Sequence, residues 1–258
     1  MSISALSPAP RRLALIPALA AIVLAPLALA AQDLPDGRAL IARHNEASGA
    51  ETLKAHKSMY TKGQLTVASQ GLDAGIEFYS AMPNRSAQKL VLPGVGEILS
   101  GFDGTTAWSM NPMQGPQVFD GDAADRIRSE SEFLGALRGP EQVTSATTVE
   151  KTEMGGTPCY KVKLVWKSGR ESFDCYAVDS GLLVGSVQTT ESPMGSMEAT
   201  TLLSEYKDFG GRKVPTKLVQ SSMGQEQVVT ITAIEYDSVP DSVFEAPPAV
   251  KAILEKKP

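Results

Sequence analysis

The sequence has 258 residues, of which 24 are Lys or Arg and 29 are Asp or Glu, and its formal net charge is −5. Because an acidic surface repels phosphate backbones, we expect no nucleic-acid partner. The length fits one large all-β domain or two small ones.

The first 30 residues have the pattern of an export signal. The pair Arg11-Arg12 leads into an apolar run from Leu13 to Leu27, and Ala28-Leu29-Ala30 supplies small residues at the cleavage positions. We predict a signal peptide over residues 1–30, cleaved near Ala30, and a periplasmic mature protein with a single domain over residues 31–258. A membrane anchor is the alternative interpretation of the run, and Sec and twin-arginine export both stay open. Cleavage removes two positive charges and changes the net charge from −5 to −7.

From the mature N-terminus to residue 139 the pattern changes from helix to strand and back to helix. Leu40, Ile41 and His44 recur at helical spacing, and a second short helical piece follows around Leu53. From Met59 the hydrophobic period becomes two, which predicts strands at residues 59–69, 74–82, 86–92, 96–102 and 105–110. Residues 111–119 are rich in Pro and Gly and are expected to form a loop. A helix is then predicted over residues 121–139, with the apolar stripe Ala124, Ile127, Leu134 and Leu137.

Strands resume after this helix, at residues 143–153, 160–166, 172–178, 182–189, 198–206, 213–221 and 227–236. This order predicts a mainly β (α+β) fold: one strongly curved antiparallel sheet with a few helices on one side. The basic tail from Lys251 to Pro258 is expected to be a solvated end.

The two cysteines, Cys159 and Cys175, are candidates for a disulfide because export leads to an oxidising compartment. They lie on two strands joined by a turn around Lys167 to Gly169. This register places Cys159 opposite Ala177, so a bridge needs a diagonal contact or a bulge. The alternative is two small buried apolar side chains in different layers.

The sequence contains no recognisable catalytic motif. His44 and His56 are the only two histidines, and both lie in the helical N-terminus. Catalysis of the Ser/His/Asp or Cys/His type would have to reach the strands from there. We therefore expect no enzyme activity, no cofactor and no metal site.

Methionine is placed in an unusual way, as the pairs Met110/Met113 and Met194/Met197 in Pro/Gly-rich sequence. Thioether pairs can hold Cu(I) in an exported protein, although no His or Cys lies near these pairs in the sequence. Two other interpretations are a surface that adapts to differently shaped apolar partners and simple gap filling.

The strands have one apolar face, which needs cover. Tyr160, Val162, Leu164 and Trp166 alternate with polar residues, mostly lysine. The sheet can close and fill its interior with side chains, or it can stay part-open and leave a lipophilic cavity under helices and loops. The residue pattern by itself leaves both solutions open.

Five segments of the sequence, taken in their order along the chain, are similar to those of a known family: "ALIARHNEASGAETLKAHKSM", "GFDGTTAWSMNP", "YAVDSGLLVG", "YKDFGGRKVPTKLVQ" and "ITAIEYDSVPDSVFEAP". In this order they resemble bacterial envelope proteins of the outer-membrane lipoprotein carrier type, the LolA/LolB-like superfamily. The resemblance implies an incomplete, strongly curved antiparallel β-barrel whose helices cover the concave side as a lid over an apolar cavity. Arg85 is, by its strand position, a candidate for the arginine that locks the carrier's lid.

We therefore expect a periplasmic lipid or lipoprotein carrier that holds acyl chains, with lipid or acylated lipoprotein as cargo and envelope membrane proteins as further partners. Four side chains are expected to border the cavity: Trp108, Met110, Met113 and Phe119. Five are expected to line it: Phe78, Leu90, Leu92, Tyr160 and Leu164. The alternative is an envelope interaction module with a filled core that docks another protein through the apolar loop.

Overall fold

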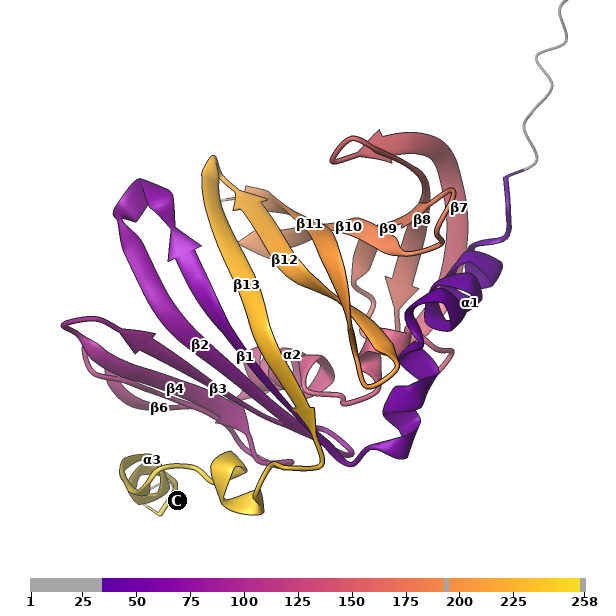
Figure 1. Cartoon of the computed structure of the whole chain (residues 1–258). Coiled ribbons are helices and arrows are strands. Elements are labelled where there is room, and N and C mark those ends of the chain that lie inside the picture. The colour runs from indigo at the N-terminus through magenta and orange to yellow at the C-terminus, as the bar shows by residue number, and fades with distance from the viewer. Residues whose placement is uncertain (1–33, 193–194, 256–258) are drawn as a thin grey trace, which may run out of the picture. The chain divides into compact units, whose positions relative to one another are not determined.

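The computed structural model describes residues 34–192 and 195–255. The predicted export segment and Met194 lie outside these ranges. Within them, 13 antiparallel strands form one sheet in the order β6-β5-β4-β3-β2-β1-β13-β12-β11-β10-β9-β8-β7 (Figure 1). The edge strands β6 and β7 do not pair with each other, so the sheet is not closed into a barrel. The prediction of a mainly β fold on one antiparallel sheet is confirmed.

The chain starts in the middle of the sheet, runs to one edge, crosses to the other edge and returns. The first half is a meander, in which short turns join neighbouring strands: β1 (Ser58–Val67), β2 (Leu72–Ala81), β3 (Arg85–Leu92), β4 (Gly96–Phe102), β5 (Ala107–Asn111) and β6 (Gly115–Phe119). The crossing contains α2 (Gly121–Glu130) and the 3-10 turn η3 (Gly135–Leu137). The second half comprises β7 (Val143–Met154), β8 (Thr157–Trp166), β9 (Glu171–Ala177), β10 (Leu183–Ser192), β11 (Gly195–Phe209), β12 (Arg212–Ser222) and β13 (Gln225–Tyr236). The last strand, β13, pairs with β1.

One face of the sheet packs against α1 (Gly37–Ser48), and we call it the α1 face. The carboxylate of Asp36 caps the helix by accepting a hydrogen bond from the backbone N–H of Ala39 (2.9 Å), and Gly49 ends it with a left-handed φ of 64°. The helix buries Leu40 and Ile41 in a cluster with apolar side chains of the second half of the sheet: Val143, Val162, Leu164, Tyr176 and Leu183. The chain then continues through the 3-10 helix η1 (Ala50–Ala55) into β1.

The opposite face, which we call the α3 face, is covered near β3 to β6 by the C-terminal segment. Phe244 of η4 (Asp241–Phe244) packs with Ala87, and Val250 of α3 (Pro248–Leu254) packs with Trp108. Helices therefore pack on both faces of the sheet, α1 on one and α3 on the other. Val250 is buried and fixes α3, whereas the described residues of the basic tail, 251–255, are exposed or half-buried. No helix in the described ranges is long and apolar enough to cross a bilayer.

Two predicted elements have different bounds. The helix predicted over residues 121–139 ends at Glu130 because the following residues bind the sheet: Phe133 is buried, and its N–H donates to the carbonyl of Pro83 (3.1 Å). Residues 115–119, expected to be a loop, form β6. Pro116 lacks a donor for the strand ladder, and it is tolerated because β6 is an edge strand.

The predicted disulfide between Cys159 and Cys175 is confirmed, with 5.6 Å between the two Cα atoms. Cys159 lies opposite Ala177, so the bridge runs diagonally between β8 and β9. Both cysteines are fully buried. The bridge therefore joins the two strands that carry most of the cluster under α1.

Candidate functional site

The α1 face carries rows of apolar side chains that cross several strands. In the first row, Ile231 of β13 lies opposite Gly63 of β1, and Gly63 lies opposite Ile76 of β2. The row continues from Ile76 to Leu90 of β3 and from Leu90 to Ile98 of β4. Since directly opposite residues lie only about 5 Å apart, Ile76, Leu90 and Ile98 form one strip of side chains, and Gly63 separates Ile231 from it.

A second row runs parallel to the first. Leu203 of β11 lies opposite Leu218 of β12, which lies opposite Val229 of β13. Val229 lies opposite Leu65 of β1, and Leu65 lies opposite Ala74 of β2. The two rows together cover the middle of the sheet from β11 to β4.

Most of these side chains are only half-buried: Leu65, Leu90, Ile98, Leu203, Leu218, Val229 and Ile231. In contrast, the apolar residues under α1, such as Val162 and Leu164, are completely buried. The difference arises because the buried cluster of α1 lies on β7 to β10 and not on β1 to β4. A half-buried apolar surface beside a covered one is typical of a site for an apolar ligand.

The crossing segment between β6 and β7 is tied to the same face. The hydroxyl groups of Ser131 and Ser86 share a hydrogen bond of 2.6 Å. At the other end of the segment, the side-chain amide of Asn45 in α1 donates to the carbonyl of Leu137 (3.0 Å). These contacts tie the segment to the start of β3 at one end and to α1 at the other.

A buried ion pair fixes the end of the crossing segment. The guanidinium of Arg138 contacts the carboxylate of Asp174 in β9, where the two side chains are 18% and 2% exposed. The hydroxyl of Tyr176 donates to the same carboxylate (3.0 Å). Burial, and to a lesser degree the charge of Asp174, raises the pKa of Tyr176 well above its usual value, so the phenol stays neutral. The sequence pattern did not predict this pair, although Asp174 is a carboxylate inside an otherwise alternating strand.

His44 of α1 lies beside this cluster as a neutral side chain. Its Nδ1 atom accepts a hydrogen bond from the backbone N–H of Leu183 (3.1 Å). Burial, followed by the positive charge of Arg138, lowers the pKa of His44 to about 4. The imidazole therefore serves as an uncharged acceptor that joins α1 to β10.

Six of the nine predicted cavity residues lie on the α1 face: Phe78, Leu90, Leu92, Phe119, Tyr160 and Leu164. Of these, Leu164 is completely buried beneath α1, whereas Leu90 and Phe119 are half-buried. Their role in binding a ligand stays a prediction.

The structure does not bring the other three together with them. Trp108 lies opposite Gly101, and Met110 lies opposite Leu99, which places both side chains on the α3 face. Trp108 is 3% exposed and packs against Val250. Met113 lies in the β5–β6 turn and is 75% exposed. Successive side chains of a strand point to opposite faces of the sheet. Trp108 and Met110 therefore lie on the α3 face, whereas Phe119 lies on the α1 face.

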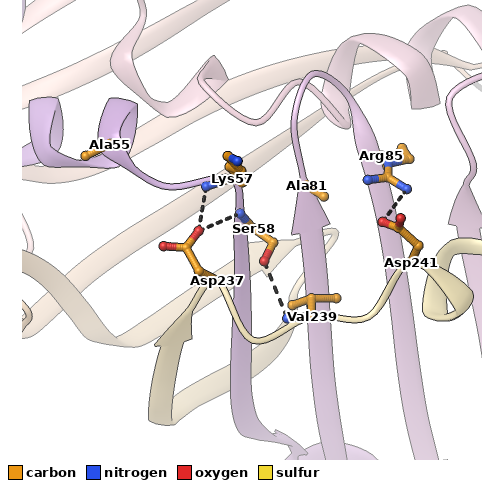
Figure 2. A pocket seen from close by; sticks show the side chains of 8 residues that line it. All are labelled: Ala55, Lys57, Ser58, Ala81, Arg85, Asp237, Val239 and Asp241. Atoms are coloured by element: carbon orange, nitrogen blue, oxygen red, sulfur yellow. Dashed lines mark hydrogen bonds and ion pairs between the residues drawn. The ribbon is translucent and has the colours of Figure 1, made fainter.

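The α3 face has a polar pocket of about 520 Å³ where β1, β2 and β3 meet the segment after β13 (Figure 2). The carboxylate of Asp237 accepts hydrogen bonds from the backbone N–H groups of Lys57 (2.6 Å) and Ser58 (3.3 Å). On the other side of the pocket, Arg85 pairs with Asp241 (2.9 Å). The Arg85 guanidinium also lies 4.9 Å from the centre of the Phe244 ring. Arg85 is therefore engaged on the α3 face, away from the apolar rows.

The described residues do not form a metal centre. Among the described residues, no three or more His, Cys, Asp or Glu side chains are arranged to hold a metal ion.

Comparison with solved structures identifies the fold. A DUF1329 family protein from Desulfovibrio piger superposes with a TM-score of 0.56 at 13% identity, covering 82% of this chain and 98% of that one. A LolA superfamily protein from Nitrosomonas europaea also gives a TM-score of 0.56, at 11% identity, with 83% and 99% of the two chains covered. The chain has the LolA-like fold.

A third similar structure bears the name of a putative outer membrane lipoprotein-sorting protein domain, from Vibrio parahaemolyticus. Its TM-score is 0.51 at 10% identity, with 83% of this chain and 99% of that chain covered. No protein-family model matches the sequence, and no curated protein is similar to it in sequence. The predicted resemblance to the LolA/LolB-like superfamily is thus confirmed for the fold.

Proposed function

We propose that this protein is a periplasmic, non-enzymatic carrier that binds the acyl chains of a lipid or an acylated lipoprotein on the α1 face. The observation that carries the proposal is the pair of half-exposed apolar rows between β11 and β4. The LolA-like fold supports it, because one structure with this fold bears the name of a lipoprotein-sorting domain.

The driving force for binding is the removal of apolar surface from water. Each methylene of an acyl chain contributes about 0.8 kcal/mol when it is fully buried. The same burial would cover side chains such as Leu90 and Ile98 that the protein leaves half-exposed. An acyl chain is slender and flexible, so it can follow a strip of opposed side chains across the strands.

The crossing segment is placed to act as the cover of this site. It is anchored at Ser131 and Arg138 and, between them, at Phe133 and Leu137, so a movement of the segment requires these contacts to open. Release of the cargo would then require a partner or a movement of this segment.

The experiment that tests the proposal is native mass spectrometry of protein purified from the periplasm, followed by organic extraction and lipid analysis. A stoichiometric acylated adduct, or saturable binding of a fluorescent fatty acid to the delipidated protein, is the expected result. A protein that carries no lipid and binds no probe would contradict the proposal and favour the interaction module with a filled core.

A further inference from the structure

Three hairpin turns carry strongly exposed apolar side chains. Val95 in the β3–β4 turn is 47% exposed, Met113 in the β5–β6 turn is 75% exposed, and Met223 in the β12–β13 turn is 69% exposed. Single exposed apolar side chains are common on protein surfaces, so what distinguishes these three is their position in the fold.

All three turns lie at the same end of the sheet. In an antiparallel meander, alternate turns lie at the same end, and β13 enters the sheet antiparallel to β1. The β1–β2, β3–β4, β5–β6 and β12–β13 turns therefore share one end, which we call the turn end. In Figure 1 the tips of β1–β2 and β12–β13 lie at the upper ends of their strands, away from η4 and α3.

Neighbouring tips of the turn end are in contact. The hydroxyl of Ser69, in the β1–β2 turn, donates to the side-chain oxygen of Gln225 at the start of β13 (3.1 Å). In the other half, a Cβ built on Gly96 would lie 3.4 Å from Cγ of Pro112. The β1–β2 turn thus adjoins the β12–β13 turn. The β3–β4 turn, which carries Val95, adjoins the β5–β6 turn, which carries Met113.

The turn end has no charge in these four turns. Residues 68–71, 93–95, 112–114 and 223–224 contain no Asp, Glu, Lys or Arg, in a protein of which 21% is charged. The β8–β9 turn, further along the sheet, is charged again, and Lys167 and Arg170 there are engaged by Glu141 and Gln188. Charges also begin in the adjoining strands, where Asp73, Glu97 and Glu226 are exposed, so the uncharged region is limited to the tips of the four turns.

This combination fits a lipid surface better than a protein partner. The apolar side chains are single and are separated by polar or flexible residues such as Gln114 and Gly224, so they do not make the contiguous core that a stable protein interface needs. Single apolar side chains can instead insert separately between lipid headgroups. Methionine suits this because its flexible thioether adapts to irregular surroundings.

We propose that the turn end docks on the uncharged or zwitterionic surface of a lipid bilayer, with Val95, Met113 and Met223 inserted at the headgroup level. This inference rests on the proposed function, because docking would bring the apolar rows of the α1 face to a membrane that supplies or receives the acylated cargo. Since the four turns contain no cation, binding depends on apolar insertion and not on anionic lipid.

The test is flotation of the full mature protein with phosphatidylcholine vesicles. The wild type should float with the vesicles equally well at about 50 mM and about 500 mM salt. The double variant Met113→Asp/Met223→Asp should bind about tenfold more weakly, since it loses two apolar insertions and adds two charges. The matched control is Met82→Asp, because Met82 is an exposed methionine (38%) in the β2–β3 turn at the opposite end of the sheet.

Several outcomes would overturn the inference: a wild type that does not float, an equal loss with Met82→Asp, or binding that requires anionic lipid and disappears in high salt. Thermal unfolding of each variant excludes a general loss of folding. Fatty-acid binding, measured on the same proteins, separates the two proposals. Protein that binds the fatty acid but not the vesicles contradicts docking alone, whereas protein that does not bind the fatty acid contradicts the proposed function.

Discussion

The guanidinium of Arg138 and the carboxylate of Asp174 form an ion pair beneath α1 that joins the crossing segment to β9. The pair lies among apolar side chains such as Val162 and Leu164, which are completely buried. Removing one member leaves the other charge buried without compensation, and such losses cost about 3 to 5 kcal/mol.

Arg138→Met should therefore lower the free energy of unfolding by about 3 kcal/mol, measured by urea denaturation at neutral pH. The double variant Arg138→Met/Asp174→Leu should recover most of this loss because it removes both charges. The control is Lys163→Met, which breaks the surface pair Lys163–Glu171 (38% and 54% exposed) and should cost less than about 1 kcal/mol. Equal effects of the two single variants would contradict the assignment of a buried pair.

Stability should depend on pH through His44. Its folded-state pKa of about 4 lies below the unfolded value of 6.5, so the unfolded chain binds the proton more tightly. The stabilisation is therefore complete above pH 6.5 and is lost as the pH falls toward 4. Between pH 7 and pH 5 the loss amounts to about 2 kcal/mol. Urea denaturation of the wild type and of His44→Gln at both pH values checks this, because the variant should lack this part of the slope.

The disulfide should contribute to stability through the unfolded chain. Cys159 and Cys175 close a loop with a sequence separation of 16, for which the chain-entropy estimate is about 3 kcal/mol. Replacing both cysteines by alanine should lower the free energy of unfolding by about this amount, measured against the oxidised wild type. If the double variant unfolds at the same urea concentration as the wild type, the bridge does not contribute to stability.

The C-terminal helix should depend on Trp108. The indole Nε1 of Trp108 is buried and has no hydrogen-bond partner among the described residues, so Trp108→Phe should be nearly neutral. Trp108→Ala should cost about 3 to 5 kcal/mol because it removes the surface on which Val250 packs. Limited proteolysis after residue 246 should become faster in the alanine variant only. Similar cleavage rates in both variants would contradict the packing of α3 on this side chain.

Local patterns predicted much of this fold from the sequence. The period-two runs indicated most strands, and the turn after Trp166 correctly placed Cys159 opposite Ala177. Strand β6 was missed because Pro116 and Gly115 are typical of loops, and only its position at the sheet edge makes a strand possible. The helix at residues 121–139 was predicted too long because its second half is held by distant partners, Pro83 and Asp174.

The candidate site was harder to predict, for a geometrical reason. Apolar residues that lie near each other in the sequence, such as Trp108 and Phe119, look equivalent there. The strand register places them on opposite faces of the sheet. In the same way, Phe173 and Cys175 are the apolar residues of alternate positions in β9, whereas the residue that meets Arg138 is Asp174 between them. Only the pairing of strands far apart in sequence decides which face a helix covers.

The most direct test of acyl-chain binding uses two adjacent residues of β3. Leu90 lies in the apolar row of the α1 face, and Val91 is 39% exposed on the α3 face. Titration of a fluorescent fatty acid into the delipidated protein should give an affinity at least about tenfold weaker for Leu90→Asp than for the wild type, with Val91→Asp within about twofold of it. Equal affinities for all three proteins, or an equal loss in both variants, would contradict a binding site on the α1 face.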